Sequence, residues 1–143
     1  MVDFIVEFYN VPEEEEVLMK KVWIAYVDGS STREYSGAWV ILKRPYGEEC
    51  EVAIQLQFTT MNNEAEYEAM ITGMNIAREM GLKNLEVKSG SQVVVKHVKG
   101  EYVARGEKMK KYLETVKEIM GLFDQITFTK VPREENSVAD ALA

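Results

Sequence analysis

The strongest constraint on the fold is a set of three strand-like apolar segments that are separated only by short turns. Residues 22–28 form an extended segment that ends at Asp28. Trp23, Ala25 and Val27 lie on one face of this segment, and the residues between them lie on the other. Residues 37–43 and 50–58 are two further strand-like segments, which follow turns at 29–31 and 45–47. Because short connections join antiparallel neighbours, residues 22–58 are predicted to form an antiparallel meander.

The rest of the chain alternates between helical and extended patterns. Asn62 and Asn63 open a predicted helix that stops at Gly81, and residues 82–88 and 125–131 read as strands. Residues 91–98 are rich in β-branched side chains and fit a helix or a strand, whereas 105–123 is a clear amphipathic helix. A final helix is predicted from Asn136. The predicted fold class is α/β, a five-stranded mixed sheet flanked by helices.

The two long helices each carry an apolar stripe at helical spacing. The predicted stripe of the first comprises Ala65, Ala69, Gly73, Ile76 and Met80. That of the second comprises Met109, Tyr112, Leu113, Val116, Ile119, Met120 and Phe123.

Length and composition fit one soluble domain. The chain has 143 residues, of which 46% are hydrophobic and 29% charged. Residues 1–20 are predicted to be a lead-in, with Glu13–Glu16 as a solvated linker, and residues 21–143 the domain. No apolar run approaches the ~20 residues that cross a membrane, so no membrane association is expected. The single Cys50 suits a reducing compartment, and we expect an intracellular, cytoplasmic or nuclear monomer.

The net charge of −7 argues against a basic nucleic-acid-binding surface, because phosphate neutralisation uses Lys and Arg. Divalent cations held by acidic side chains would invert that local charge. The global charge is therefore weak evidence about nucleic-acid binding.

Isolated acids at the ends of predicted elements are the strongest chemical signal. Asp28 ends the first strand, whereas Glu66 and Asp140 lie in the first turns of helices. Position 90 follows a strand in the same way. Strand ends and helix starts can converge on one patch, and carboxylate oxygens are the ligands that Mg²⁺ prefers. Two such ions about 4 Å apart can activate the attacking and leaving oxygens of a phosphodiester.

Four motifs carry a specific resemblance. The segments WIAYVDGSS (23–31), NNEAEYEAMITGMNIA (62–77), SGSQVVVKHVKGEY (89–102) and VPREENSVADALA (131–143) occur in this order. Together they resemble the ribonuclease H domain of plant long-terminal-repeat retrotransposon polyproteins of the Ty3/gypsy type. The lead-in DFIVEF is similar to the segment that follows reverse transcriptase in such polyproteins.

The resemblance implies a ribonuclease H-like fold and a two-metal endonuclease that cuts the RNA strand of RNA–DNA hybrids. It implies Mg²⁺ as cofactor, with Mn²⁺ as a substitute, and an adjoining reverse transcriptase as a possible partner. Carried over by motif, the catalytic and metal-binding carboxylates are Asp28, Glu66 and Asp140, and the fourth would stand at position 90. Asn62, Asn63 and Gln92 match amide residues that contact the minor groove of the hybrid.

The chain departs from the family pattern at its most important position. The motif Ser-x-Ser-Gln normally holds Asp, but here it holds Gly90, which offers no metal ligand. Met61 replaces a usual Thr, and Trp39 stands where a small Gly is common. The histidine that bacterial members carry before the last helix is absent from residues 130–135, as in many retroelement relatives.

Structural explanations compete with these roles. Asp28 could be a turn former, and Glu66 could be one of three acids favoured by the helix dipole. The sole histidine, His97, is expected to be structural, and Lys108, Lys110 and Lys111 suit either a solvated face or the DNA backbone.

Three hypotheses about the whole domain follow. The first is an RNA–DNA hybrid ribonuclease, severely impaired by Gly90. The second is a catalytically dead module that binds nucleic acid or protein partners, and the third is an unrelated α/β binding module.

Overall fold

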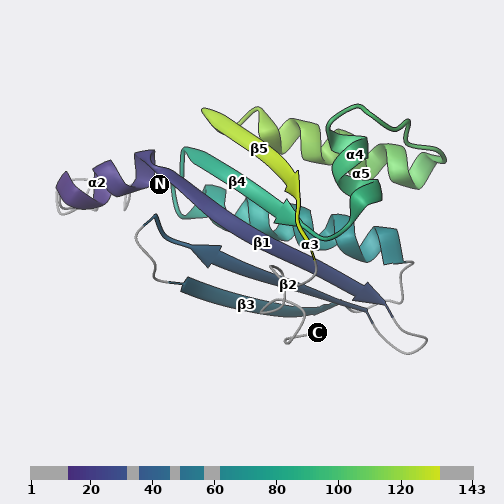
Figure 1. The fold of residues 1–143 in the computed structure, drawn as a ribbon, viewed down its shortest axis with the longest axis horizontal. Helices are drawn as coiled ribbons and strands as arrows, with labels where there is room; N and C mark the ends of the chain where they lie inside the picture. The colour runs from purple at the N-terminus through teal and green to yellow at the C-terminus, as the bar shows by residue number, and fades with distance from the viewer. Residues whose placement is uncertain (1–12, 32–35, 46–48, 57–61, 133–143) are drawn as a thin grey trace, which may run out of the picture.

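The computed structural model describes residues 13–31, 36–45, 49–56 and 62–132 (Figure 1). In chain order the elements are α2 (Glu13–Lys20), β1 (Val22–Ser31), β2 (Ser36–Lys43), β3 (Glu49–Leu56), α3 (Asn62–Glu79), β4 (Asn84–Ser89), α4 (Gln92–Val98), α5 (Glu107–Met120) and β5 (Gln125–Lys130). Within these ranges no helix has both the length and the apolar content to cross a bilayer.

The strands form one five-stranded sheet in the order β3-β2-β1-β4-β5. The strands β1, β2 and β3 pair antiparallel, whereas β1 with β4 and β4 with β5 pair parallel. The predicted mixed sheet with an antiparallel meander is therefore confirmed. The central strand β1 is the place where antiparallel pairing on one side changes to parallel pairing on the other.

The alternation in β1 separates the two faces of the sheet. Trp23, Ala25 and Val27 are buried, whereas the residues between them are only half-buried. Helix α3 covers the buried face, as Figure 1 shows by its place behind β1. A side chain at Gly73 of α3 would meet Val27 at 2.9 Å from its Cβ, so the helix packs closely on β1.

Helix α3 begins and ends as predicted, but its buried side is wider than the predicted stripe. Gly81 has a φ of 83°, and the Leu82 amide closes the end on the Ala77 carbonyl. The predicted Ile76 is half-buried and packs against the core, whereas Met80 is 37% exposed, so only Met80 was wrongly included in the stripe. Because α3 packs on the sheet and also on α4 and α5, its buried arc extends to Tyr67, Met70, Met74 and Ala77.

The ambiguous segment after β4 is a short helix, α4. The Ser91 hydroxyl accepts a hydrogen bond from the Val94 amide, which caps the helix N-terminus. The predicted stripe of α5 is confirmed: Val116, Ile119 and the following Phe123 are buried, and the other members pack against the core.

Residues 13–16, which were expected to be a solvated linker, form the first half of helix α2. Acidic side chains favour a helix N-terminus, and Lys20 lies at the other end. Leu18 and Met19 pack against the core, and the Trp23 indole Nε1 donates to the Leu18 carbonyl at 2.9 Å. Packing of the last turn therefore stabilises a segment that has little apolar pattern of its own. The predicted final helix from Asn136 lies outside the described residues.

Candidate metal and nucleic-acid site

Asp28 and position 90 lie at the same end of neighbouring strands. The last parallel pair between β1 and β4 is Val27 with Ser89, so the next residues along the two strands are Asp28 and Gly90. Neighbouring strands lie about 4.8 Å apart, which places these two positions side by side. Both follow residues buried in the core, and Gly90 itself is exposed.

The first turns of α3 pack directly on the end of β1 through Gly29. A Cβ at Gly29 would lie 2.1 Å from the Ala65 carbonyl oxygen and 2.5 Å from the Glu66 amide nitrogen. Only glycine allows this approach. The contact brings the backbone of Glu66 against the residue that follows Asp28, as the sequence motifs predict.

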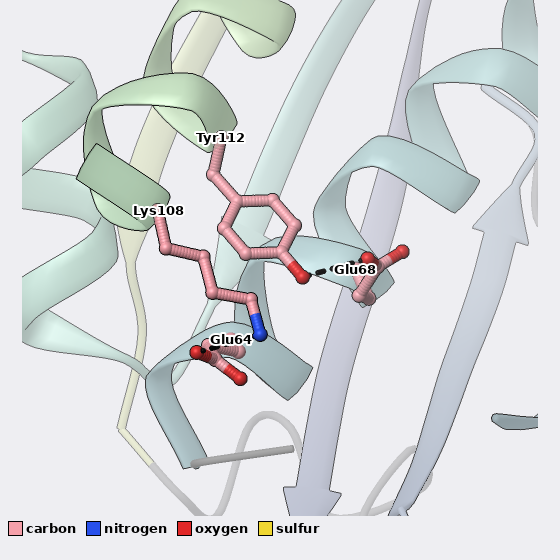
Figure 2. A network of polar contacts seen from close by, with 4 residues as sticks. All are labelled: Glu64, Glu68, Lys108 and Tyr112. Carbon is pink, nitrogen blue, oxygen red and sulfur yellow. Dashed lines mark hydrogen bonds and ion pairs between the residues drawn. The ribbon is translucent and has the colours of Figure 1, made fainter. Parts of the chain in front are cut away.

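The three acids at the start of α3 are divided between two sides of the helix. Glu64 and Glu68 are one turn apart and face α5, as Figure 2 shows. Glu66 is two positions from each, so its side chain leaves the opposite side of the helix. It is 7% exposed, and its Oε2 atom is buried and accepts no hydrogen bond within the described residues, although Glu66 has other polar interactions.

Glu64 and Glu68 join α3 to α5 through two matched contacts (Figure 2). The Lys108 ammonium lies 3.2 Å from Glu64 Oε1, and the Tyr112 hydroxyl donates to Glu68 Oε1 at 2.8 Å. Burial, followed by the hydrogen bond to Glu68, raises the pKa of Tyr112. These contacts hold the first turns of α3, which carry Glu66, against a second helix. The sequence reasoning missed them, although acids and partners four residues apart on both helices were a usable signal.

Position 90 is held in a fixed turn by the hydroxyls on either side. The Ser91 amide donates to Ser89 Oγ at 3.1 Å, and the Ser91 side chain caps α4. The described glycines with positive φ are Gly81, Gly100 and Gly106, so Gly90 has a backbone that other residues adopt. The main chain is therefore compatible with the Asp that the motif normally holds.

The remaining predicted site residues are only partly described. Asn63 and Gln92 are exposed in the first turns of α3 and α4, the turns that adjoin Gly29 and Gly90. Asn62 begins α3, but its side chain is outside the description. Asp140 and Met61 also lie outside the described residues. Among the residues that the structure does describe, no three His, Cys, Asp or Glu side chains gather into a metal-binding group.

His97 was expected to have a surface or half-buried structural role, but it is 7% exposed and lies among aromatic side chains. Its Nδ1 lies 2.9 Å from the Tyr67 hydroxyl, and Tyr67 stacks on Tyr112 with ring centroids 5.4 Å apart. Burial lowers the pKa of His97 and raises the pKa of Tyr67 to about 12, so both groups are neutral at pH 7. The pair joins α3 to the end of α4.

Two of the similarities are to ribonuclease H from Halobacterium salinarum, one in sequence and one in structure. Its ribonuclease HI is 32% identical over 122 residues, which cover 83% of this chain and 61% of the archaeal protein. This chain thus spans less than two thirds of that relative. The crystal structure of ribonuclease H1 from the same archaeon superimposes with a TM-score of 0.82 at 28% identity, covering 86% of this chain and 95% of that one.

A third similarity is to a structure solved with nucleic acid. LC11-RNase H1 in complex with an RNA/DNA hybrid superimposes with a TM-score of 0.77 at 26% identity, covering 84% of this chain and 92% of that chain. The sequence profile of the family described as reverse transcriptase-like matches residues 26–143. Because the family profile matches most of the chain and the fold superimposes on ribonuclease H structures, this chain belongs to the reverse transcriptase-like family as a ribonuclease H-like domain.

Proposed function

We propose that this domain binds RNA–DNA hybrids and cuts their RNA strand with divalent cations, slowly because position 90 is glycine. The observation that carries the proposal is the meeting of Asp28, Gly90 and the first turns of α3 at one end of β1. The fold similarity to a ribonuclease H1 solved with a hybrid supports the class of ligand.

Asp28 and Glu66 are suited to a divalent cation by their chemistry. Both offer hard carboxylate oxygens, and Glu66 is only 7% exposed. Asp140 is the third proposed ligand by motif. When bound, Mg²⁺ or Mn²⁺ would supply Lewis-acid activation of water and phosphate.

The protein itself supplies positioning. The close contact at Gly29 fixes Glu66 relative to the end of β1, and the contacts to α5 hold the same helix turns from the other side. The exposed Asn63 and Gln92 amides, with Asn62, are proposed to read the minor groove, where the 2′-hydroxyl distinguishes RNA from DNA.

The motifs also lead us to propose a retrotransposon polyprotein as the origin of the domain, with a reverse transcriptase as its neighbour. The description of the matching family is consistent with that origin.

A cleavage assay tests the proposed activity. A hybrid labelled on the RNA strand is incubated with the chain and Mg²⁺ or Mn²⁺, beside single-stranded RNA and duplex DNA as controls. We expect slow, metal-dependent cutting of the hybrid alone. Asp28→Asn and Glu66→Gln should each abolish it, while Glu114→Gln, an exposed acid on α5, should not.

The second candidate is a module that binds hybrids without cutting, and Gly90 is the observation that favours it. Under this hypothesis the chain shifts the hybrid in a gel assay but leaves the RNA intact with either metal. Asp28→Asn would then change neither binding nor cutting.

A further inference from the structure

Asp28 has a different neighbour on each side of its strand. On the β4 side is Gly90, which has no side chain and is exposed. On the β2 side the directly opposed residue is Trp39. Directly opposed residues on antiparallel strands point to the same face with Cβ atoms about 5 Å apart, so the indole ring rises beside Asp28.

The position of the Trp39 indole ring follows from the lack of space for a side chain at Gly37. A Cβ on Gly37 would lie 2.1 Å from Trp39 Cη2 and 2.5 Å from Cζ3. The six-membered ring therefore covers Gly37, which is opposite Ser30, beyond Asp28 toward the end of β1. Trp39 is only 8% exposed, and its side chain runs along β2 from the position opposite Asp28 to the position opposite Ser30, as a buried apolar wall beside β1.

We propose that Trp39 is a positioning residue of the candidate metal site, which closes the β2 side of Asp28 and directs its carboxylate toward position 90. The inference rests on the proposed function, because it assigns a role toward the cation that Asp28 would hold. A carboxylate with an open side can occupy each of its staggered χ1 rotamers. A wall on one side removes those that point away from the metal.

The size of the effect follows from the rotamer count. Asp28 also has a polar interaction of its own, so the indole is not its sole restraint. If removing the wall lets Asp28 distribute over as many as about three rotamers, the competent fraction falls to about one third at the lowest, and the apparent Kd for the cation rises by up to about threefold. Trp39→Leu removes the ring but keeps an apolar side chain, so we expect weakening up to that limit. Trp39→Phe keeps a planar ring and should retain most of the affinity.

Mn²⁺ alone is the probe, and its binding is measured from the electron paramagnetic resonance signal of free Mn²⁺. The chain and its Gly90→Asp variant are titrated in parallel. Trp23→Phe is the matched control, because Trp23 is in the same strand about 17 Å before Asp28 and faces the helices. It should leave the Kd unchanged.

A double-mutant cycle separates positioning from general packing. If Trp39 acts through Asp28, the effect of Trp39→Leu disappears in the Asp28→Asn background. An equal effect in both backgrounds, or an unchanged Kd in Trp39→Leu, overturns the role of Trp39 and leaves the metal site standing. No Mn²⁺ binding in either the chain or Gly90→Asp overturns the proposed metal site itself.

Fluorescence provides a second readout that needs no change at Trp39. In the Trp23→Phe chain Trp39 is the sole tryptophan, and bound paramagnetic Mn²⁺ should quench it strongly. In the Trp39→Phe chain the remaining Trp23 should keep its emission. Mn²⁺ binding without quenching of Trp39 would contradict the proposed adjacency, even if Trp39→Leu does not fold.

Discussion

Restoring Asp at position 90 should change stability and activity in ways that depend on metal. The new carboxylate would lie about 5 Å from that of Asp28 across neighbouring strands. Two like charges at that distance repel by about 1 kcal/mol in water and about 3 kcal/mol at an effective dielectric constant of 20. In EDTA, Gly90→Asp should therefore lower the free energy of unfolding by up to about 3 kcal/mol.

With divalent cations present, Gly90→Asp should instead raise the free energy of unfolding. At a Mg²⁺ concentration a hundredfold above Kd, binding to the folded state adds about 2.7 kcal/mol of stability. The carboxylate introduced by Gly90→Asp should also increase the rate of hybrid cleavage by about 10², equivalent to about 2.7 kcal/mol of transition-state stabilisation. Affinity for the hybrid should change little, because the groove contacts do not involve position 90.

The assay is thermal unfolding in EDTA and in Mg²⁺, paired with single-turnover cleavage of a labelled hybrid. Gly90→Asn is the matched control, since it has the same size but no charge. It should show neither the metal-dependent stabilisation nor the full gain in rate. If Gly90→Asp unfolds at the same temperature with and without Mg²⁺ and cuts no faster, position 90 is not beside a metal site.

Three further predictions concern the structure around the site. Gly29→Ala should destabilise the fold by about 1–3 kcal/mol in urea unfolding, because its Cβ would overlap the α3 backbone, whereas Gly121→Ala, whose Cβ meets only an atom at 3.5 Å, should have little effect. The lowered pKa of His97 means that the unfolded chain binds a proton more readily, so stability should fall as the pH drops below about 6.5. His97→Gln should lose less stability than the parent between pH 7.5 and 5.5, and an equal loss would contradict the assignment. Tyr112→Phe should cost about 1 kcal/mol by removing the hydrogen bond to Glu68, and an unchanged urea midpoint would show that this contact does not stabilise the helix pair.

Those parts of the fold could be predicted in which a local sequence pattern alone determines the secondary structure. Alternation in β1 predicted the strand and its two faces, because a strand exposes successive side chains to opposite sides, but it did not show which face is buried. Gly81 marked the end of α3 through its positive φ. Helix α2 and the wide buried arc of α3 could not be predicted in this way, because both depend on contacts with elements distant in the sequence.

The sequence motifs identified the candidate site residues. They did not show which acids of α3 belong to the site and which contact α5. Glu64, Glu66 and Glu68 look equivalent in sequence. The partners on α5 show that Glu64 and Glu68 join two helices, whereas the backbone of Glu66 lies against Gly29 at the end of β1. Nor could the sequence show that Trp39 is opposite Asp28, since strand register depends on the turn between them.

The change from antiparallel to parallel pairing at β1 has a consequence for the order of folding. The β1–β2 ladder joins residues that are close in sequence, whereas the β1–β4 ladder joins Val22 to Asn84 across the whole of α3. Distant pairings cost more chain entropy and generally form more slowly. We therefore expect the meander to form first and β4 to dock later. A nascent chain would carry Asp28 for some time before Gly90 arrives beside it, so the candidate metal site is assembled only once folding is nearly complete.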